Sequence, residues 1–326
     1  MKFNAFWVEK TENGFERSII EREVDDLPEG DVVIDVAYSS LNYKDGLSAS
    51  GSPGVTRNYP HTPGIDAAGT VAESSSAKFS QGDEVIVIGF DLGMNTSGGF
   101  GAKIRVPSDW VVKMPDGLDL RSSMIIGTAG FTAAECIQKL EMAGLSKDAG
   151  PVLVTGATGG VGSVAVKLLA QMGHEVHAVT GKSDKKDFLA SLGASEVLSR
   201  DQIMEGVEKP LLKETWAGVV DTVGGDMLFN ALKGLRYGGS LAACGLVGGP
   251  GFSATVLPFI LRHVNLLGVD SVQLPIGEKE IIWNRLASDW KVDLSSLEEV
   301  LHLDSLSGAI DRILKGEMVG RGVLHY

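Results

Sequence analysis

The chain has 326 residues, of which 44% are hydrophobic and 22% are charged, and its formal net charge at pH 7 is −13. Its length favours two domains, and its composition is that of an ordinary globular protein. Such an acidic chain is poorly suited to nucleic acid or to an anionic membrane as a partner, so an anionic ligand would need a local basic pocket.

The first residues, "MKFNAFWVEK", lack the long apolar core of a secretory signal peptide, because Glu9 and Lys10 follow a very short apolar run. No stretch approaches the roughly 18 consecutive apolar residues of a transmembrane helix. The two cysteines, Cys136 and Cys244, are too few for a disulfide framework or a four-thiolate zinc site. These features favour a reducing compartment, and we expect a cytoplasmic protein.

Short strands and turns are the dominant pattern from residue 1 to about residue 121. Apolar residues recur at Val32, Ile34 and Val36, which is the period of a half-buried strand. Similar runs occupy 82–90 and 103–115, and Gly, Pro, Asn and Ser residues separate them. The best helix candidate in this part is the segment "NYKDGLSASG". We therefore predict a β-rich domain, such as a distorted barrel.

After about Ser122, helices and strands alternate. A first helix is predicted over 124–145, and it ends at the glycine of "AGL". The predicted strands that follow are 151–156, 175–181, 196–200, 216–224, 240–248 and 264–271, and the predicted helices are 159–173, 185–194 and 226–239. This alternation predicts a parallel sheet covered by helices on both faces. The tail carries a predicted helix over 278–290 and a predicted strand over 320–326.

A glycine-rich turn, "ATGGVG", lies between a predicted strand and a predicted helix. In the usual G-x-G-x-x-G fingerprint, Gly159 and Gly162 match the second and third glycines, and Ala157 replaces the first. Backbone N–H groups of such a turn, together with the helix N-terminus, can bind a pyrophosphate. The alternative is a tight turn that merely needs glycine, but the strand–turn–helix–strand setting favours a dinucleotide. The predicted contacts are Thr158, Gly159, Gly160, Val161 and Gly162.

The end of the second strand of this unit lacks the acid that binds the ribose hydroxyls in NAD-specific sites. Lys182 and the hydroxyls of Thr180 and Ser183 could instead bind the 2′-phosphate of NADP, and Arg200 could supply a second cation. Solvated surface lysines are the alternative, and two nearby aspartates weaken the positive charge. The predicted contacts to the adenosine end are Thr180, Gly181, Lys182, Ser183 and Arg200, and NADPH is the predicted cofactor.

From end to end, the sequence resembles the medium-chain dehydrogenase/reductase superfamily. The segments that carry this resemblance include "SSLNYKDGL", "PGIDAAGTV", "GDEVIV", "VTGATGGVG", "DTVGG" and "YGGSLAACG". The combination of "LNYKD", "MIIGTAGFTA" and "PFILRHVNLLGVDS" is more specific. It resembles the YhdH/YhfP branch, which contains quinone oxidoreductases and NADPH-dependent acryloyl-CoA reductases.

The resemblance implies an α/β protein made of two kinds of domain. These are a GroES-like, β-rich catalytic domain (1–122) and a Rossmann NADP-binding domain with a doubly wound parallel sheet (123–270), after which the tail (271–326) returns to the catalytic domain. It also implies a zinc-independent, NADPH-dependent oxidoreductase that transfers a hydride to an activated C=C bond of an acryloyl-CoA-type enoyl thioester. Two other functions stay open, namely reduction of quinones by NADPH and NADPH binding without catalysis.

Zinc enzymes of this superfamily bind their metal through a cysteine, a histidine and a second cysteine or an acid. In this sequence Leu41 replaces the cysteine before "NYKD", and Ile65 and Asp66 stand where a "GHE" motif would supply the histidine. His61 lies just upstream, but no cysteine is near it in the sequence, so we expect it at a loop or pocket edge. We expect no metal, and reduction of an activated double bond or of a quinone needs none.

In related reductases the segment that matches "LNYKD" lies beside the nicotinamide, so Asn42, Tyr43 and Asp45 are the candidate catalytic residues. Tyr43 is expected to line the site and contact the cofactor or substrate, and a packed aromatic at a strand end is the alternative. A role for Tyr43 as proton donor is less favoured, because a phenol is a weak acid. Asp45 would orient its neighbours or only cap a helix. The resemblance places further cofactor contacts at Thr128, Cys244, Gly245, Leu246, Val269, Ser271 and Arg321.

Three expectations concern partners and packing. Cys244 is expected to pack rather than to act as a nucleophile, since no motif places a histidine base beside it. A CoA substrate would need local cations, for which Lys44, Arg57 and Arg262 are candidates.

Related proteins pair edge strands across a two-fold axis. The segment 265–272, "NLLGVDSV", could do so in a homodimer, although the same run would suit a buried internal strand.

Overall fold

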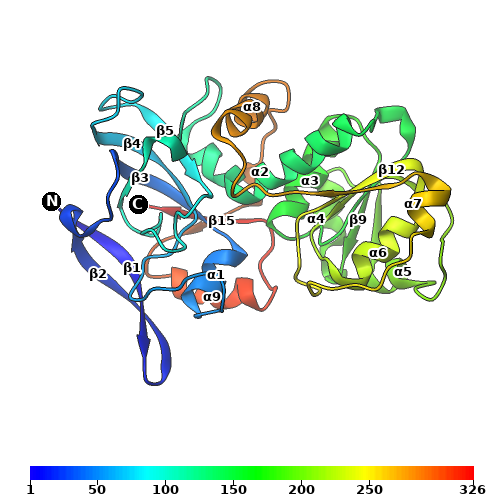
Figure 1. Ribbon diagram of the computed structural model, residues 1–326, viewed down its shortest axis with the longest axis horizontal. Helices are drawn as coiled ribbons and strands as arrows, with labels where there is room; N and C mark the ends of the chain where they lie inside the picture. The colour runs from blue at the N-terminus through cyan, green and yellow to red at the C-terminus, as the bar shows by residue number, and fades with distance from the viewer. The chain divides into compact units, whose positions relative to one another are not determined.

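The computed structural model describes all 326 residues, and the chain divides into two compact units (Figure 1). Unit 1 comprises Met1–Thr128, Ser271–Asp289 and Asp293–Tyr326, and unit 2 comprises Ala129–Asp270 and Trp290–Val292. Each unit has its own sheet and its own apolar core. None of the helices combines the length and the apolar character that crossing a membrane requires.

Unit 1 contains a seven-stranded sheet and a separate two-stranded hairpin. Its strands are β1 (Lys2–Thr11), β2 (Gly14–Glu23), β3 (Val32–Leu41), β4 (Asp66–Ser74), β5 (Glu84–Ile88), β6 (Lys103–Val106), β7 (Val111–Lys113), β14 (Glu298–Leu301) and β15 (Arg321–His325). The sheet has the order β14-β15-β3-β4-β5-β7, while β6 also pairs with β3 and β1 pairs with β2. The alternating Val32, Ile34 and Val36 are buried in one core with residues of β4 and β5, which confirms the predicted strand.

The C-terminal strand β15 returns to unit 1 and pairs antiparallel with β3. In this register Gly322 lies opposite Leu41, so the preceding residue, Arg321, is brought to the end of β3. The next residue after β3, Asn42, is the N-cap of helix α1 (Tyr43–Ala49). The predicted terminal strand and the predicted short helix are therefore both present, and their pairing places Arg321 next to the "LNYKD" segment.

Two further helices of unit 1 lie in its tail, namely α8 (Ile276–Ala287) and α9 (Leu306–Leu314). The same unit has three short 3-10 helices, η1 (Val24–Asp26), η2 (Ser108–Trp110) and η5 (Ser295–Leu297). The sequence predicted α8 but not α9, whose buried Leu306, Ala309 and Ile310 follow the helical spacing over only nine residues. Helix α9 packs on α1, where Gly46 meets Leu314, and Figure 1 draws the two helices next to each other.

Helix α2 (Leu120–Met142) is kinked at Gly127, which has φ 50° and ψ −163°. This positive φ favours glycine. A Cβ atom at this position would also lie 2.3 Å from Ser40 Oγ, 2.5 Å from Asp66 Oδ2 and 2.6 Å from Arg321 Nη2. The glycine therefore serves two purposes: it allows the kink and it leaves room for a buried polar cluster.

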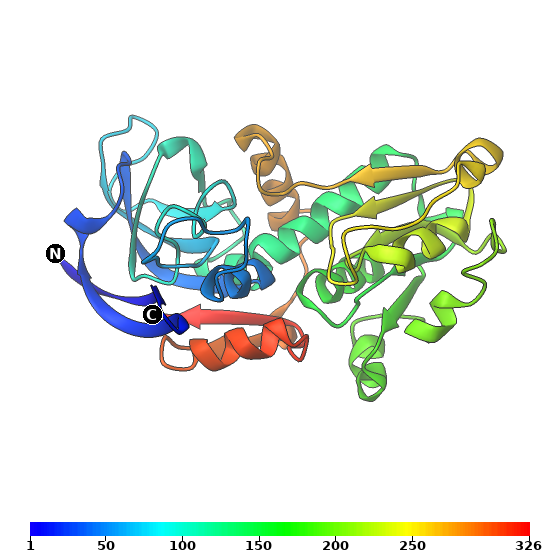
Figure 2. The same ribbon diagram turned by 60° about the horizontal axis from the view of Figure 1, so that its bottom comes forward.

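Unit 2 is a parallel six-stranded sheet of order β10-β9-β8-β11-β12-β13. Its strands are β8 (Val152–Val154), β9 (Val176–Thr180), β10 (Glu196–Ser199), β11 (Trp216–Asp221), β12 (Leu235–Ala243) and β13 (Asn265–Gly268), and its helices besides most of α2 are α3 (Gly160–Gln171), α4 (Lys186–Ser191), α5 (Arg200–Met204), α6 (Gly225–Lys233) and α7 (Leu257–Arg262), with 3-10 turns η3 (Lys147–Ala149) and η4 (Ser183–Lys185). The order reverses between β8 and β11, which makes this a doubly wound sheet with its switch point at that pair of strands. Figure 2 shows β12 and β13 running side by side at one edge. The predicted α/β fold is confirmed.

One prediction in unit 2 needs correction, and one alternative that the sequence left open is decided. The predicted helix 226–239 ends early, because α6 stops at Lys233 and Leu235 already begins β12, which pairs with β11. Gly234 is the C-cap of α6, and the chain turns there into the sheet. The segment 264–271 was compatible with an internal strand or an edge strand, and β13 lies at the edge of the sheet.

Candidate active site

The carboxylate of Asp66, at the first position of β4, is fully buried and accepts hydrogen bonds from three residues. Its Oδ2 atom accepts from the Ser40 hydroxyl, from Asn42 Nδ2 at 2.8 Å and from the Thr128 backbone N–H at 2.9 Å. Its Oδ1 atom accepts from the Thr128 hydroxyl. A carboxylate is tolerated in such a place because hydrogen bonds replace its water. Asp66 therefore connects the end of β3 to the kink of α2.

The guanidinium of Arg321 lies in the same buried cluster and is only 2% exposed. Nε donates to Ile125 O at 3.0 Å, and Nη1 donates to Asn42 Oδ1 at 3.3 Å. Nη2 has no hydrogen-bond partner and lies 3.9 Å from Asp66 Oδ2. Burial lowers the pKa of Arg321, and the nearby Asp66 and Asp45 act in the opposite direction. We call Ser40, Asn42, Asp66, Thr128 and Arg321 the Asp66 network.

Asp45 is part of the scaffold that holds α1. Its Oδ2 accepts from the Asn42 backbone N–H at 2.8 Å, which is the capping-box contact, and its Oδ1 accepts from the N–H groups of Gly64 at 3.1 Å and Ile65 at 2.9 Å. Both carboxylate oxygens are thus used by backbone groups. Of the two roles expected for Asp45, the structure supports capping and local orientation. Burial, with the nearby Asp66, raises the pKa of Asp45 to about 7 despite these backbone donors.

The raised pKa of Asp45 predicts a pH-dependent stability. The folded protein holds the Asp45 proton more tightly than the unfolded chain does. The protonated carboxyl therefore contributes fully to the free energy of unfolding below pH 4, and this contribution is lost as pH rises through about 7. The loss amounts to as much as about 4 kcal/mol. Denaturant unfolding from pH 5 to 8 should show the wild type losing stability relative to Asp45→Asn, which cannot ionise there. Parallel stability curves for the two proteins would contradict the shift.

The side chain of Tyr43, at the first position of α1, is 37% exposed and its hydroxyl forms no hydrogen bond within the chain. A packed aromatic at a strand end would be buried. The exposed ring and the unused hydroxyl are those of a side chain that can meet a ligand. Contact between Tyr43 and a cofactor or substrate stays a prediction.

The glycine-rich turn of unit 2 follows β8 and leads into α3. A Cβ atom at Gly162 would lie 2.4 Å from Gly156 O, so the third glycine permits close packing of α3 on the turn. A Cβ atom at Gly159 would meet only Gly156 O at an ordinary 3.4 Å, so this position faces open space. The first N–H groups of a helix have no acceptor within the helix. The turn therefore provides a glycine-lined approach to unused donors, which fits the diphosphate of a dinucleotide.

The predicted adenosine contacts lie at the end of β9. Thr180 Oγ1 accepts from the Lys182 N–H at 3.0 Å and lies 3.4 Å from Thr158 Oγ1. A Cβ atom at Gly181 would be 2.7 Å from Arg200 Nε, so the guanidinium lies over the backbone of this glycine. Arg200 forms no ion pair with a carboxylate and remains available to an anion. The structure brings these sequence-predicted residues together at one edge of the sheet.

The carboxyl ends of β11 and β12 lie at the same end of the parallel sheet as the carboxyl end of β9. Asp221, the last residue of β11, accepts from Thr155 Oγ1 at 2.6 Å and from the Gly224 N–H at 2.8 Å, and burial raises its pKa. The Cys244 thiol donates to Asp221 O at 3.3 Å, and Gly245 is needed because a Cβ atom would lie 1.9 Å from a backbone oxygen. No histidine ring nitrogen contacts Cys244, so the structure offers it no base.

The thiol of Cys136 is buried on α2 and hydrogen-bonds to the Cys244 thiol. This hydrogen bond and burial raise the pKa of Cys136 well above the usual range of a thiol. A thiol held in its protonated form is a poor nucleophile. Cys136 is therefore a packing residue of unit 2, and the half-buried Cys244 lies beside it.

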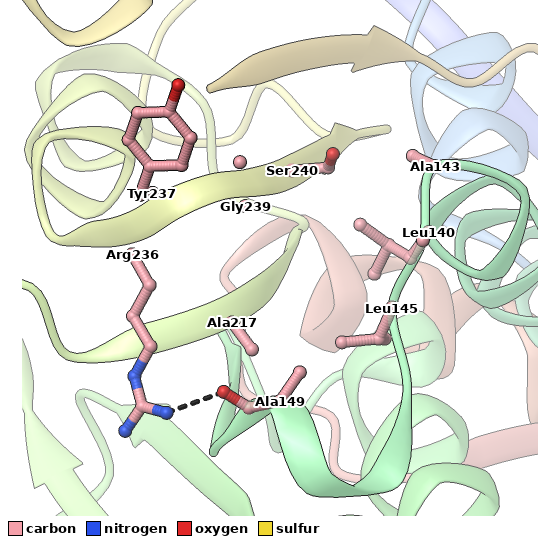
Figure 3. Close-up of a pocket in the computed structure, with 11 residues that line it drawn as sticks. Leu140, Ala143, Leu145, Ala149, Ala217, Arg236, Tyr237, Gly239 and Ser240 are labelled. Carbon is pink, nitrogen blue, oxygen red and sulfur yellow. Dashed lines mark hydrogen bonds between the residues drawn. The ribbon is translucent and has the colours of Figure 1, made fainter. Parts of the chain in front are cut away.

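A separate cavity of about 110 Å³ lies at the opposite, amino-terminal edge of the sheet in unit 2 (Figure 3). It is lined by residues at the start of β12, including Arg236 and Tyr237, and by Leu140 and Leu145 near the end of α2. Arg236 Nη1 donates to Ala149 O at 2.5 Å, and Nε donates to Thr215 O at 3.0 Å. None of the predicted site residues lines this cavity, so it is distinct from the candidate cofactor site.

The residues at the positions expected for zinc do not form a metal site. No three His, Cys, Asp or Glu side chains come together in a geometry that could hold an ion. His61 is buried, its Nε2 contacts Gly93 O at 2.9 Å, and burial lowers its pKa. Asp66, in place of the "GHE" histidine, is held by the hydrogen bonds of its network. These residues do not fit a zinc centre.

Two family models match this chain. One, described as an alcohol dehydrogenase GroES-like domain, matches residues 28–116, and the other, described as a zinc-binding dehydrogenase, matches residues 160–287. A curated protein of Ruegeria pomeroyi, named acrylyl-CoA reductase AcuI, is 48% identical over 99% of this chain and 98% of its own length. The chain belongs to the medium-chain dehydrogenase/reductase superfamily. YhfP of Bacillus subtilis, whose name places it among quinone oxidoreductases, is 45% identical over 99% of this chain and 98% of its own length.

Solved structures of this medium-chain family match both units. The structure of Escherichia coli YhdH with bound NADPH has a TM-score of 0.95 and 44% identity, and covers 98% of this chain and 99% of its own. The structure of Bacillus subtilis yhfP with NAD bound has a TM-score of 0.97 and 44% identity, with full coverage of both chains. The predicted GroES-like and Rossmann architecture and the predicted branch of the superfamily are thus confirmed.

The predicted cofactor residues of this medium-chain protein occur in both units. Tyr43, Thr128, Ser271 and Arg321 belong to unit 1, and the others, including Val269, belong to unit 2. Their contacts with a cofactor stay predictions. The sequence reasoning missed Ser40 and Asp66 as site residues, because it considered "PGIDAAG" only as a possible source of a zinc ligand. A charged residue directly before the apolar Ala67 and Ala68 of β4 was the available signal.

One expected phosphate ligand is excluded by its contacts. Arg262 Nη1 donates to Lys233 O at 2.8 Å, its Nη2 donates to Leu212 O at 2.6 Å, and its Nε lies 3.4 Å from Glu214 Oε1. The guanidinium already binds two carbonyl groups and a carboxylate of unit 2. We therefore remove Arg262 from the candidates for binding a CoA phosphate.

Proposed function

We propose that this protein is an NADPH-dependent reductase whose substrate is an enoyl thioester of the acryloyl-CoA type. The observation that carries the proposal is the 48% identity over nearly the whole chain to a protein named acrylyl-CoA reductase. The double bond of such a thioester is already activated by its carbonyl group. Its reduction therefore needs positioning and charge stabilisation by the protein rather than a zinc ion.

The glycine-rich turn and its cationic neighbour support NADPH as the cofactor. When bound, NADPH supplies the hydride for the reduction. Gly159 gives the diphosphate access to backbone donors, and Arg200 lies unpaired beside Gly181, where the 2′-phosphate would be received. The structure of a relative, YhdH, contains NADPH, whereas that of yhfP contains NAD. The preference of this protein for NADPH must therefore be measured against NADH.

The cofactor preference predicts a specific result for the double variant Lys182→Glu/Arg200→Ala. The KM for NADPH should rise by about tenfold or more, because charge-assisted contacts to the 2′-phosphate are lost and an acid is introduced. The KM for NADH should change little, because NADH lacks that phosphate. Steady-state kinetics with both cofactors measures the difference. Equal changes for NADH and NADPH would refute the assignment.

For the substrate side, we propose that Tyr43 contacts the substrate or cofactor and that the Asp66 network positions its neighbours. Tyr43 has an exposed ring and an unused hydroxyl, and it directly follows Asn42. Asn42 and Thr128 both donate hydrogen bonds to the Asp66 carboxylate, so their positions are fixed by the network. Asp45 has no free oxygen for proton transfer and acts by holding α1.

A second candidate function is reduction of quinones, which the name of the relative YhfP favours. Purified protein with NADPH, followed by the absorbance of the reduced nicotinamide, should be assayed with acryloyl-CoA and with a simple quinone. We expect the larger kcat/KM for acryloyl-CoA. A larger value for the quinone would establish the second function instead. Turnover of neither would favour the third alternative, a protein that binds NADPH without catalysis.

We also propose a homodimer formed along β13 and a cytoplasmic location. Strand β13 is an unpaired edge, its Leu266 is 38% exposed, and the neighbouring α7 exposes Ile260 and Leu261. Such an edge is a template for pairing with a second copy. Two free cysteines without a disulfide suit a reducing compartment. Light scattering that reports a monomer at micromolar concentration would contradict the dimer, and secretion of the native protein would contradict the location.

A further inference from the structure

Most lysine and arginine side chains of unit 1 are already occupied by the protein itself. Some form ion pairs with carboxylates, as Lys78 does with Asp109, and others bind backbone carbonyl groups, as Lys279 does with Ile88 O. The side chains of Lys44 and Arg57 are among the few that do neither. In a chain with a net charge of −13, cations without a partner are the natural binding groups for an anionic ligand.

We propose that Lys44 and Arg57 bind the phosphate groups of the CoA part of the substrate. This inference rests on the proposed function, since it assigns a part of the same substrate. The inference assigns to these two cations the selection of CoA thioesters over thioesters without phosphates. Reduction of the double bond itself does not require them.

The two cations are carried by two segments that meet, namely α1 and the loop that follows it. Lys44 and Ser48 are one helical turn apart and therefore lie on the same face of α1. Ser48 Oγ is 2.6 Å from Thr56 Oγ1, and the Tyr59 hydroxyl donates to Ser48 O at 2.5 Å. Arg57 directly follows Thr56. The contact at Ser48 thus brings the loop that carries Arg57 onto the face of α1 that carries Lys44.

The backbone around Arg57 is held while its side chain is left available. Asn95 Oδ1 accepts from the Arg57 backbone N–H at 3.1 Å, and the residue is exposed. The Asp91 carboxylate accepts from Asn95 Nδ2 at 2.9 Å and from the Thr96 hydroxyl at 3.0 Å, and it forms no ion pair with Arg57. A planar guanidinium and a flexible ammonium together suit a ligand with several phosphoryl groups.

The position of Lys44 connects this pair of cations to the candidate site. Lys44 directly follows Tyr43, whose exposed ring is the proposed contact to substrate or cofactor. The acyl group of an acyl-CoA is joined to its phosphates by a long, flexible arm. Cations on this face of α1 and in the loop that contacts it are therefore suited to hold the distant end of the molecule while the thioester lies near Tyr43.

The test compares two thioesters with the same acyl group. Acryloyl-CoA carries the phosphates, and acryloyl-N-acetylcysteamine does not. In Lys44→Ala/Arg57→Ala, the ratio of kcat/KM for acryloyl-CoA to kcat/KM for acryloyl-N-acetylcysteamine should fall by about tenfold, because two charge-assisted contacts are lost. The KM for NADPH should stay unchanged, which separates the phosphates of CoA from those of the cofactor. In the wild type the same ratio should fall as salt is raised.

The matched control is Lys213→Ala/Lys315→Ala, which removes the same charge from two exposed, unpaired lysines. Lys213 lies in unit 2, and Lys315 is the C-cap of α9, which packs on α1 at Gly46, away from the face of Lys44. This control should keep the wild-type ratio, and Lys44→Arg/Arg57→Lys should keep most of it. An unchanged ratio in the alanine variant, or an equal fall in the control, would overturn the proposal even if acryloyl-CoA is a good substrate. Failure of the wild type to reduce either thioester would instead overturn the proposed function, and the inference with it.

Discussion

Replacing Asp66 with alanine is expected to lower the free energy of unfolding by about 3–5 kcal/mol. The substitution removes the acceptor for Ser40, Asn42 and Thr128 and leaves the Arg321 guanidinium buried without its carboxylate. The cost of a buried, unpaired charge exceeds that of the hydrogen bonds alone. Denaturant unfolding followed by circular dichroism measures the change.

Two further variants make this prediction specific to the buried network. Asp109→Ala removes an aspartate of the same unit whose side chain is 78% exposed in its pair with Lys78, so it should cost at most about 1 kcal/mol. Asp66→Leu/Arg321→Met replaces both charges with apolar groups and should recover much of the loss, because no charge is then left unpaired. If Asp66→Ala were as stable as Asp109→Ala, the network would not be a stabilising element of unit 1.

The second large effect is expected at Gly159, where an alanine should leave the fold intact but greatly weaken NADPH binding. The backbone at Gly159 has φ −79° and ψ 177°, which any residue adopts, and a Cβ atom there meets its nearest neighbour at 3.4 Å. The free energy of unfolding should therefore change by less than about 0.5 kcal/mol. A methyl group in the open space of the turn would occupy the approach of the diphosphate, so the Kd for NADPH should rise by at least about tenfold.

Gly162→Ala is the informative counterpart, because the same methyl group has a different consequence there. Its Cβ atom would lie 2.4 Å from Gly156 O and 2.7 Å from the Ala157 Cα, so the turn or α3 must shift. A loss of about 1–3 kcal/mol in the free energy of unfolding is expected without any cofactor. Thermal unfolding with and without NADPH, combined with fluorescence titration, separates the two effects. Gly159→Ala binding NADPH as tightly as the wild type would contradict the assignment of this turn.

The predictions from the sequence agree best with the structure where a motif is made of residues that are neighbours in the chain. The strand, turn and helix around Gly159 and Gly162 occupy neighbouring positions, and each obeys a local rule of burial period or glycine placement. The same holds for α1, where Asn42 and Asp45 form the capping box at a spacing of three residues. The boundary between α6 and β12 was predicted less well, because the pairing of Leu235 with β11 overrode a locally helical pattern.

The Asp66 network could not be predicted in the same way. Thr128 reaches Asp66 across 62 positions, and Arg321 reaches Asn42 across 279 positions. Whether such side chains meet depends on how β15 pairs with β3 and on the kink at Gly127. Neither the strand pairing nor the kink produces a pattern of apolar residues that could be recognised in the sequence. The availability of Arg57 and the occupied state of Arg262 likewise depend on neighbours that only the folded chain supplies.

The sequence by itself determined that this chain has a glycine-rich turn between a strand and a helix, no acid at the end of the next strand and no set of zinc ligands, because these features are carried by residue types at short, fixed spacings. It also identified the superfamily. The tertiary structure decided that Asp66 and Arg321 form one buried network, that Asp45 serves the backbone and that β13 lies at an edge. The physical reason is that burial and pairing arise from contacts between distant segments, whereas local periodicity records only which face of each segment is apolar.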